Sequence, residues 1–181
     1  MLSDSDGEFL LNIARKVVEN TAKNEKFIKP RSYPASLDKN MGVFCTITKN
    51  GELRGCIGIP YPTMSVIDAL ISAACSVCED PRFPRLAEDE ARDIKIEISI
   101  LTEPELIKSE PENYPSMIEK KYGLILEYGP YTGLFLPQVW EEVPEKEQFL
   151  DHLCVKAGLS SGMWKQKGTK LYKFEVQIFE E

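Results

Sequence analysis

The stretch from residue 93 to residue 101 constrains the fold more than any other part of the chain, because its side chains alternate strictly. One face of an extended backbone would carry four isoleucines and the other face polar residues: Ile94, Ile96, Ile98 and Ile100 against Lys95, Glu97 and Ser99. Such alternation is typical of a strand that buries one face in a core. We therefore predict a half-buried strand here, which needs other strands beside it.

A hairpin is predicted between residues 43–48 and residues 53–57. The segment that joins them contains Asn50-Gly51, a strong signal for a two-residue turn. With that turn, Cys45 would lie opposite Cys56, and Ile47 opposite Arg54.

A second hairpin and a closing strand are predicted in the later part of the chain. Residues 124–128 and 134–136 flank a turn segment at residues 129–133, which is rich in glycine and proline. Residues 170–179 form the closing strand, in which every second position from Tyr172 is apolar. These positions, expected on one face, are Tyr172, Phe174, Val176 and Ile178.

Three longer helices are predicted from apolar residues that recur with helical period. The first runs from a capping-box spacing at Ser5 to Glu8 as far as about residue 20. The second starts at Thr63 or Ser65 and is stopped before Pro81, and the third begins near Pro144 and ends near Gly158. Shorter helical turns are expected at residues 87–92 and 115–121.

This order of elements predicts an α+β fold with a mainly antiparallel sheet and flanking helices. A chain of 181 residues is long enough for one domain with a sizeable core. We expect a single domain over residues 1–181, with a larger and a smaller lobe.

Charge, apolar length and cysteine content argue against several kinds of partner and compartment. The chain has 22 basic and 29 acidic residues, a net charge of −7, and its basic residues are scattered, so nucleic acid is not an expected partner. No apolar stretch reaches the roughly 20 residues that span a bilayer, and no secretory signal pattern is seen. Five cysteines without a disulfide framework favour a reduced, cytoplasmic protein.

The segment Leu53–Gly58 is the first candidate for function. Alternation along a strand puts Arg54 and Cys56 on one face, where a guanidinium would favour the reactive thiolate. Gly55 would allow close approach of a backbone or a ligand, and Gly58 a turn with positive φ. The alternative is a buried apolar cysteine with a structural arginine.

The segment Asp80–Pro84 is the second candidate, because the predicted helix before it could return the chain to the same end of the sheet. Asp80 could then pair with Arg54 or with Arg82. A helix stop held by two prolines and an ion pair is the alternative. Glu97 would add a carboxylate, although the polar face of its strand fits a solvated surface better.

Cys75 and Cys78 form a Cys-x-x-Cys pair that we interpret as structural. A zinc site would need a second pair or histidines at ligand spacing, and the chain has one histidine. A redox pair would lie at a helix start, where the helix dipole lowers the thiol pKa, whereas these cysteines are expected near a helix end. No phosphate-binding loop is found either, so we predict no metal and no cofactor.

Several segments together resemble the AMMECR domain family, named for the Alport syndrome, midface hypoplasia and elliptocytosis chromosomal region. The resemblance covers nearly the whole chain, and the closing segment 177–181 is similar to the archaeal branch. The matching segments are Leu53–Gly58, Asp80–Pro84, Ile96–Thr102, Gly133–Val139 and Lys156–Leu159.

The resemblance implies an α+β fold with two lobes and no established reaction. It also implies a pathway shared with Memo-like and radical-SAM proteins. The family's site residues carry over to matching positions only, and they are Arg54, Gly55, Cys56, Gly58, Asp80, Arg82 and Glu97.

Three hypotheses follow for these residues. The first is a non-catalytic binding or adaptor module that recognises a protein partner or a small anionic metabolite. The second is an enzyme with Cys56 as nucleophile and Arg54 or Arg82 as anion clamp. The third is a purely structural motif.

Overall fold

The computed structural model describes residues 1–181, and the chain divides into two compact units. Unit 1 consists of Met1–Leu101 together with Gln177–Glu181, and unit 2 consists of Thr102–Val176. Each unit has its own four-stranded sheet and its own buried core. The α+β prediction is therefore confirmed.

The sheet of unit 1 contains the strand that the alternating pattern predicts. Its strand order is β2-β1-β3-β8, and β1 pairs antiparallel with both β2 and β3. All four isoleucines of β3 are at most 3% exposed. The strands are β1 (Gly42–Lys49), β2 (Glu52–Ile59), β3 (Ile94–Leu101) and β8 (Val176–Glu180).

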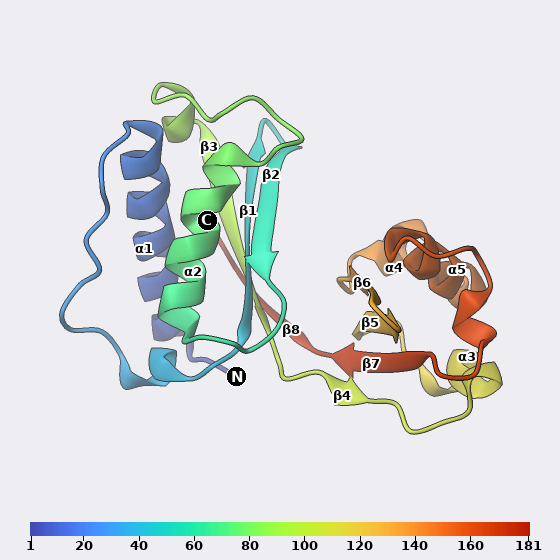
Figure 1. The fold of residues 1–181 in the computed structure, drawn as a ribbon. Helices are drawn as coiled ribbons and strands as arrows, with labels where there is room; N and C mark the ends of the chain where they lie inside the picture. The colour runs from blue at the N-terminus through green and yellow to red at the C-terminus, as the bar shows by residue number, and fades with distance from the viewer. The chain divides into compact units, whose positions relative to one another are not determined.

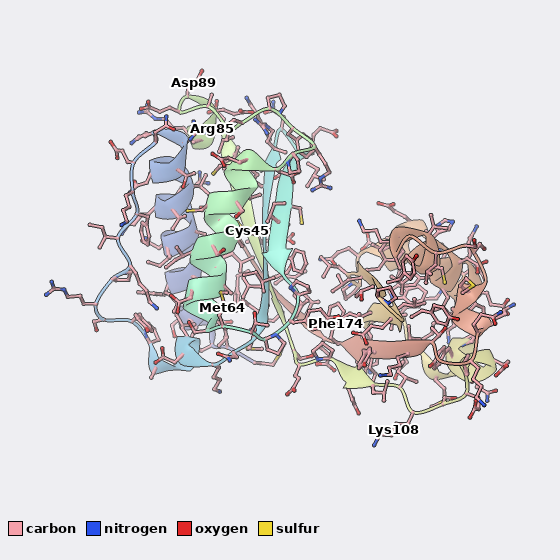
Figure 2. The ribbon with its side chains drawn as sticks, viewed as in Figure 1. Cys45, Met64, Arg85, Asp89, Lys108 and Phe174 are labelled. Carbon is pink, nitrogen blue, oxygen red and sulfur yellow. The ribbon has the colours of Figure 1, made fainter.

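Two helices, α1 (Asp4–Ala22) and α2 (Val66–Ser76), lie side by side on one face of this sheet (Figure 1). Three short 3₁₀ helices accompany them, and they are η1 (Ala35–Asp38), η2 (Val77–Glu79) and η3 (Glu90–Arg92). The apolar faces of both helices meet the isoleucines of β3 in one core. Cys45 belongs to this core and lies between the sheet and α2 (Figure 2).

The start of α1 corrects the predicted cap. Ser3, not Ser5, caps the helix, because Asp6 occupies the third helical position and completes the capping box. The Ser3 hydroxyl accepts a hydrogen bond from the Asp6 N–H at 3.2 Å, and the Asp6 carboxylate accepts from the Ser3 N–H at 3.0 Å. Ser36 also donates to Asp6, which fixes the cap to η1.

The first hairpin turns at Asn50-Gly51, as predicted, and both residues have positive φ. The predicted register is wrong, however, because β2 contains a β-bulge: Ile47 pairs with Gly55 and Thr48 with Leu53, which leaves Arg54 without a cross-strand partner. The extra residue shifts the pairs beyond it, so that Thr46 lies opposite Cys56 and Cys45 opposite Ile57.

Unit 2 has the strand order β4-β7-β5-β6, with antiparallel pairs throughout. Trp140 stacks on Phe149 in its core, with ring centroids 3.5 Å apart. The turn of the second hairpin is shorter than predicted, because Tyr128 pairs with Tyr131 and only Gly129-Pro130 remains between the strands. The strands are β4 (Glu105–Leu106), β5 (Gly123–Tyr128), β6 (Tyr131–Phe135) and β7 (Lys170–Phe174).

The helices of unit 2 include the third predicted helix, which begins two residues after Pro144 and ends before Gly158. Its apolar side chains pack against the sheet. The helical elements are η4 (Pro111–Asn113), α3 (Tyr114–Met117), α4 (Val139–Glu142), α5 (Lys146–Lys156) and η5 (Met163–Lys165).

The closing strand predicted over residues 170–179 is two strands, β7 in one sheet and β8 in the other. The break falls at Glu175, whose N–H donates to the Thr102 hydroxyl at 2.9 Å and whose carbonyl accepts from the Thr102 N–H at 3.0 Å. The predicted single apolar face is therefore wrong: Phe174 is buried, whereas Ile178 is 43% exposed.

Candidate functional site

The segment Leu53–Gly58 lies on β2, which is an edge strand of the unit 1 sheet. The outward backbone groups of Cys56 are nevertheless paired, because side chains of the Asp80–Pro84 segment reach them. The Cys56 N–H donates to Asp80 Oδ2 at 3.0 Å, and Arg82 Nη2 donates to the Cys56 carbonyl at 3.2 Å. The two segments therefore come together as predicted, with side chains in the place of a neighbouring strand.

Asp80 holds this arrangement from a buried position, with only 1% of its side chain exposed. It pairs with Arg82, one of its two predicted partners, through contacts of 3.0 Å to Nε and 2.7 Å to Nη2. The Arg82 guanidinium, assisted by the N–H groups of Cys56 and Arg82, holds the pKa of Asp80 well below its usual range. Asp80 is therefore ionised at neutral pH.

Arg54 pairs with Glu90, a residue that sequence reasoning missed. Its Nε and Nη2 donate to the two Glu90 oxygens at 2.8 and 2.9 Å, and Nη2 also reaches the Pro84 carbonyl at 2.8 Å. Arg54, together with Lys49, lowers the pKa of Glu90 to about 2. The guanidinium that was expected to act on the Cys56 thiol is thus engaged by a carboxylate. The only sequence signal for it was a run of three acidic residues, residues 88–90, in the helical turn predicted at 87–92.

The two glycines of the segment are sites of close approach. A Cβ atom at Gly55 would lie 2.9 Å from both the side chain and the carbonyl oxygen of Val77. A Cβ atom at Gly58 would lie 2.4 Å from the Phe44 ring and from the Val43 carbonyl oxygen. Gly55 thus meets the protein's own backbone, and the turn with positive φ predicted at Gly58 is absent because Gly58 lies within β2.

A row of polar side chains crosses three strands of the sheet. Thr46 on β1 lies opposite Cys56 on β2 and opposite Glu97 on β3, so all three side chains share one face. The Thr46 hydroxyl donates to the Cys56 sulfur at 3.3 Å, and Ser99 donates to Glu97 at 3.4 Å. Thr46 was not among the predicted residues, because the bulge sets its position.

The strand face that carries Glu97 is less solvated than its polar residues suggested. Ser99 is 1% exposed and Glu97 is half-buried. Burial, and then the nearby charge of Glu180, raises the pKa of Glu97. Ionised Glu97 therefore costs stability in the folded state.

Replacing Glu97 with glutamine is expected to raise the free energy of unfolding at pH 7 by a few tenths to about 1 kcal/mol. Because the folded-state pKa is raised, protonation favours the folded state and the cost is absent once wild-type Glu97 is protonated. The gain should therefore disappear at about pH 3, well below the ordinary glutamate pKa of 4.5. Urea unfolding at both pH values measures this, and an equal gain at both would contradict it.

The Phe83 ring lies within cation–π distance of both arginines of the site. The guanidinium carbons of Arg54 and Arg82 are 5.8 and 5.6 Å from the centre of its ring. The Arg82 side chain is 54% exposed, and Leu53, the first residue of the segment Leu53–Gly58, is 45% exposed. An exposed arginine and an aromatic ring thus occupy the outer part of the site, and an exposed apolar side chain lies near the start of β2.

The Cys-x-x-Cys pair lies at the end of α2 and in η2, as predicted. Cys78 is buried, its thiol donates to the carbonyl of Ala74 at 3.4 Å, and burial raises its pKa to about 12. Cys75 is half-buried and lies 3.4 Å from the Thr21 hydroxyl. Burial therefore disfavours the thiolate form of Cys78 that redox chemistry would need.

A family model described as AMMECR1 matches residues 11–179. The chain belongs to the AMMECR1 family. Protein MJ0810 of Methanocaldococcus jannaschii is 47% identical over 187 residues, which cover 100% of this chain and 92% of that protein. Protein PF1979 of Pyrococcus furiosus is 42% identical over 193 residues, with 99% and 90% covered. These relatives are archaeal, in agreement with the resemblance of the closing segment.

A solved structure extends the AMMECR1 comparison to the fold. The crystal structure of the uncharacterized protein PH0010 from Pyrococcus horikoshii matches with a TM-score of 0.93 and 42% identity, over 99% of this chain and 93% of that one. None of the helices in this AMMECR1-family chain has the length and apolarity that crossing a membrane requires. No group of three or more histidine, cysteine, aspartate or glutamate side chains is arranged to hold a metal ion.

Proposed function

We propose that this AMMECR1-family protein is a non-catalytic binding or adaptor module, and that its recognition surface is the outer part of the site around Arg82, Phe83 and Leu53. The observation that carries the proposal is the pairing of both arginines. Arg54 and Arg82 each hold a carboxylate through two nitrogens, so their charges are neutralised within the site.

The same pairing favours a protein partner over a small anionic metabolite. An anion would have to compete with Glu90 for Arg54 and with Asp80 for Arg82, at carboxylates already in place. A protein partner can instead use the exposed part of Arg82 together with the apolar surface of Phe83 and Leu53. Arginine and aromatic residues are the types enriched at the energetic centres of protein interfaces. The partners that the family resemblance implies are Memo-like and radical-SAM proteins.

Capture of partners by immobilised protein tests the proposal. Arg82→Ala and Phe83→Ala are each expected to reduce capture of the purified Memo-like or radical-SAM protein at least tenfold. Arg85→Ala is the matched control, because Arg85 is a neighbouring exposed arginine whose ion pair with Glu79 lies at the surface. Thermal unfolding of each variant shows that it is folded. Capture by both site variants at the wild-type level would contradict the proposed surface.

An enzyme with Cys56 as nucleophile is the alternative that the half-buried Cys56 thiol keeps open. The group that contacts its sulfur is the Thr46 hydroxyl, which donates a hydrogen bond and is not a general base. We therefore expect Cys56 to react with iodoacetamide no faster than an unperturbed thiol at every pH from 6 to 9. A large rate excess at pH 6 would favour the enzyme.

A further inference from the structure

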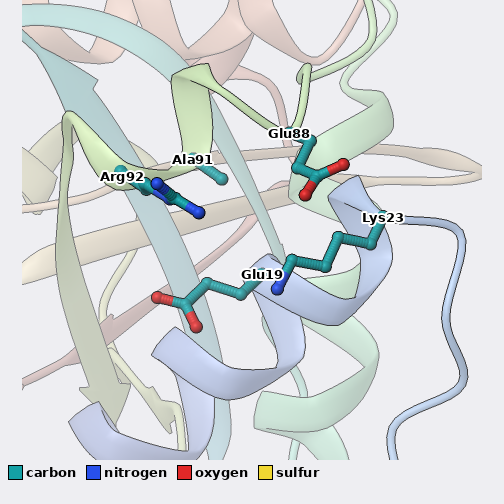
Figure 3. Close-up of a pocket in the computed structure, with 5 residues that line it drawn as sticks. All are labelled: Glu19, Lys23, Glu88, Ala91 and Arg92. Carbon is teal, nitrogen blue, oxygen red and sulfur yellow. The ribbon is translucent and has the colours of Figure 1, made fainter.

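A cavity lies in unit 1 between the end of α1 and the segment that contains η3. Its accessible volume is about 140 Å³, and its lining is Glu19, Lys23, Glu88, Ala91 and Arg92 (Figure 3). One water needs only about 10–15 Å³ of such volume, so the cavity has room for a small organic molecule.

The charges of this cavity are balanced, two of each sign, and unpaired. Glu19 and Glu88 supply two carboxylates, and Lys23 and Arg92 supply an ammonium and a guanidinium. None of these four side chains makes an ion pair or a side-chain hydrogen bond with any residue of the chain. In Figure 3 the side chains of Glu88, Lys23 and Arg92 converge on the same space.

The floor of the cavity is rigid. Ala91 is 2% exposed, and its carbonyl oxygen accepts a hydrogen bond from Arg15 Nη1 at 2.8 Å. Arg15 Nη2 holds the Ile94 carbonyl at 2.9 Å, and the same guanidinium forms an ion pair with Glu181. The backbone on either side of Arg92 is therefore held by Arg15, whereas the Arg92 guanidinium itself has no partner in the chain.

We propose that this cavity binds a small zwitterion, a free α-amino acid, with its carboxylate on Arg92 and Lys23 and its ammonium on Glu88. The inference follows from charge complementarity. A ligand with one charge would satisfy the groups of one sign and leave the other sign facing it unfavourably, whereas a ligand with both charges satisfies Arg92, Lys23 and Glu88 together. This site shares no residue with the proposed recognition surface, so either proposal can fail without the other.

Titration of the full-length protein with L-alanine tests the site, with the amide NMR signals of Ala91 and Arg92 as the readout. Propionate and ethylamine are the matched ligands, because each keeps one charge of alanine and lacks the other. Alanine is expected to give saturable shifts, and the two analogues to bind at least tenfold more weakly. Arg92→Gln and Glu88→Gln should each weaken alanine binding at least tenfold.

Lys16→Gln is the control, because Lys16 is an exposed charge on α1 outside the cavity. It should leave the binding of alanine unchanged. The proposal is overturned if alanine gives no saturable shift, if propionate or ethylamine binds as well as alanine, or if Lys16→Gln weakens binding as much as Arg92→Gln does. If alanine does not bind, the four charged side chains would instead fit a contact with charged side chains of another protein.

Discussion

Replacing Asp80 with asparagine is expected to lower the free energy of unfolding by about 2–4 kcal/mol at pH 7. The buried carboxylate accepts hydrogen bonds from the Cys56 N–H, the Arg82 N–H and the Arg82 guanidinium. An amide keeps one oxygen but turns an NH₂ group towards donors, so at least one buried contact is lost. Urea unfolding of both proteins measures the difference.

The stability difference between wild type and Asp80→Asn depends on pH. The folded-state pKa of Asp80 lies below its ordinary value of 3.8, so its contribution is fully present above that value and is lost as the pH falls through the folded-state pKa. The difference between wild type and Asp80→Asn should therefore shrink in strong acid.

Glu79→Gln is the matched control for Asp80, because the neighbouring Glu79–Arg85 pair has side chains that are 63% and 42% exposed. Its cost should stay below about 1 kcal/mol. Equal costs at the two positions would show that the buried contacts of Asp80 add nothing.

Replacing Gly55 with alanine is expected to cost about 1–3 kcal/mol, and replacing it with valine still more. The added Cβ would lie 2.9 Å from Val77 Cγ2, 2.9 Å from the Val77 carbonyl oxygen and 3.3 Å from Ile47 Cγ1. Since the carbonyl belongs to the helical turn that leads into Asp80, the strain should move the Asp80–Pro84 segment away from β2. Chemical denaturation gives the cost, and the amide signal of Cys56 reports the displacement.

A double-mutant cycle with Val77→Ala separates the two contacts of the new methyl group. Removing the Val77 side chain relieves the Cγ2 contact and leaves the carbonyl contact, so Gly55→Ala should cost less in the Val77→Ala background without becoming neutral. Strictly additive costs would mean that the Val77 side chain plays no part in excluding a methyl group at Gly55.

Elements with a local sequence pattern could be predicted well. The isoleucines of β3, the Asn50-Gly51 turn and the stop at Gly158 are each set by neighbours within a few residues. The partner of Asp80 was predicted only as Arg54 or Arg82, and the structure selects Arg82, two positions away. The proximity of the segment Leu53–Gly58 to Asp80 could be predicted as well, since the helix between them returns the chain to the same end of the sheet.

Features that depend on distant segments could not be predicted. Arg54 and Glu90 are 36 positions apart. The β-bulge that leaves Arg54 without a cross-strand partner is not indicated by any pattern of residue types in β2. The break between β7 and β8 depends in the same way on Thr102, 73 positions before Glu175. Alternation continues through Glu175, so periodicity alone predicts one uninterrupted strand where the chain passes from one sheet to the other.

The division of the unit 1 sheet between two distant segments has a consequence during synthesis on the ribosome. β8 completes the sheet beside β3, but all of residues 102–175 must be translated between them. At about 5–20 residues per second, the nascent β3 therefore keeps one unpaired edge for roughly 4–15 s. An unpaired strand edge beside an incomplete apolar core is a binding template for other chains. Translation is thus the stage at which the edge of β3 is open to pairing with other chains.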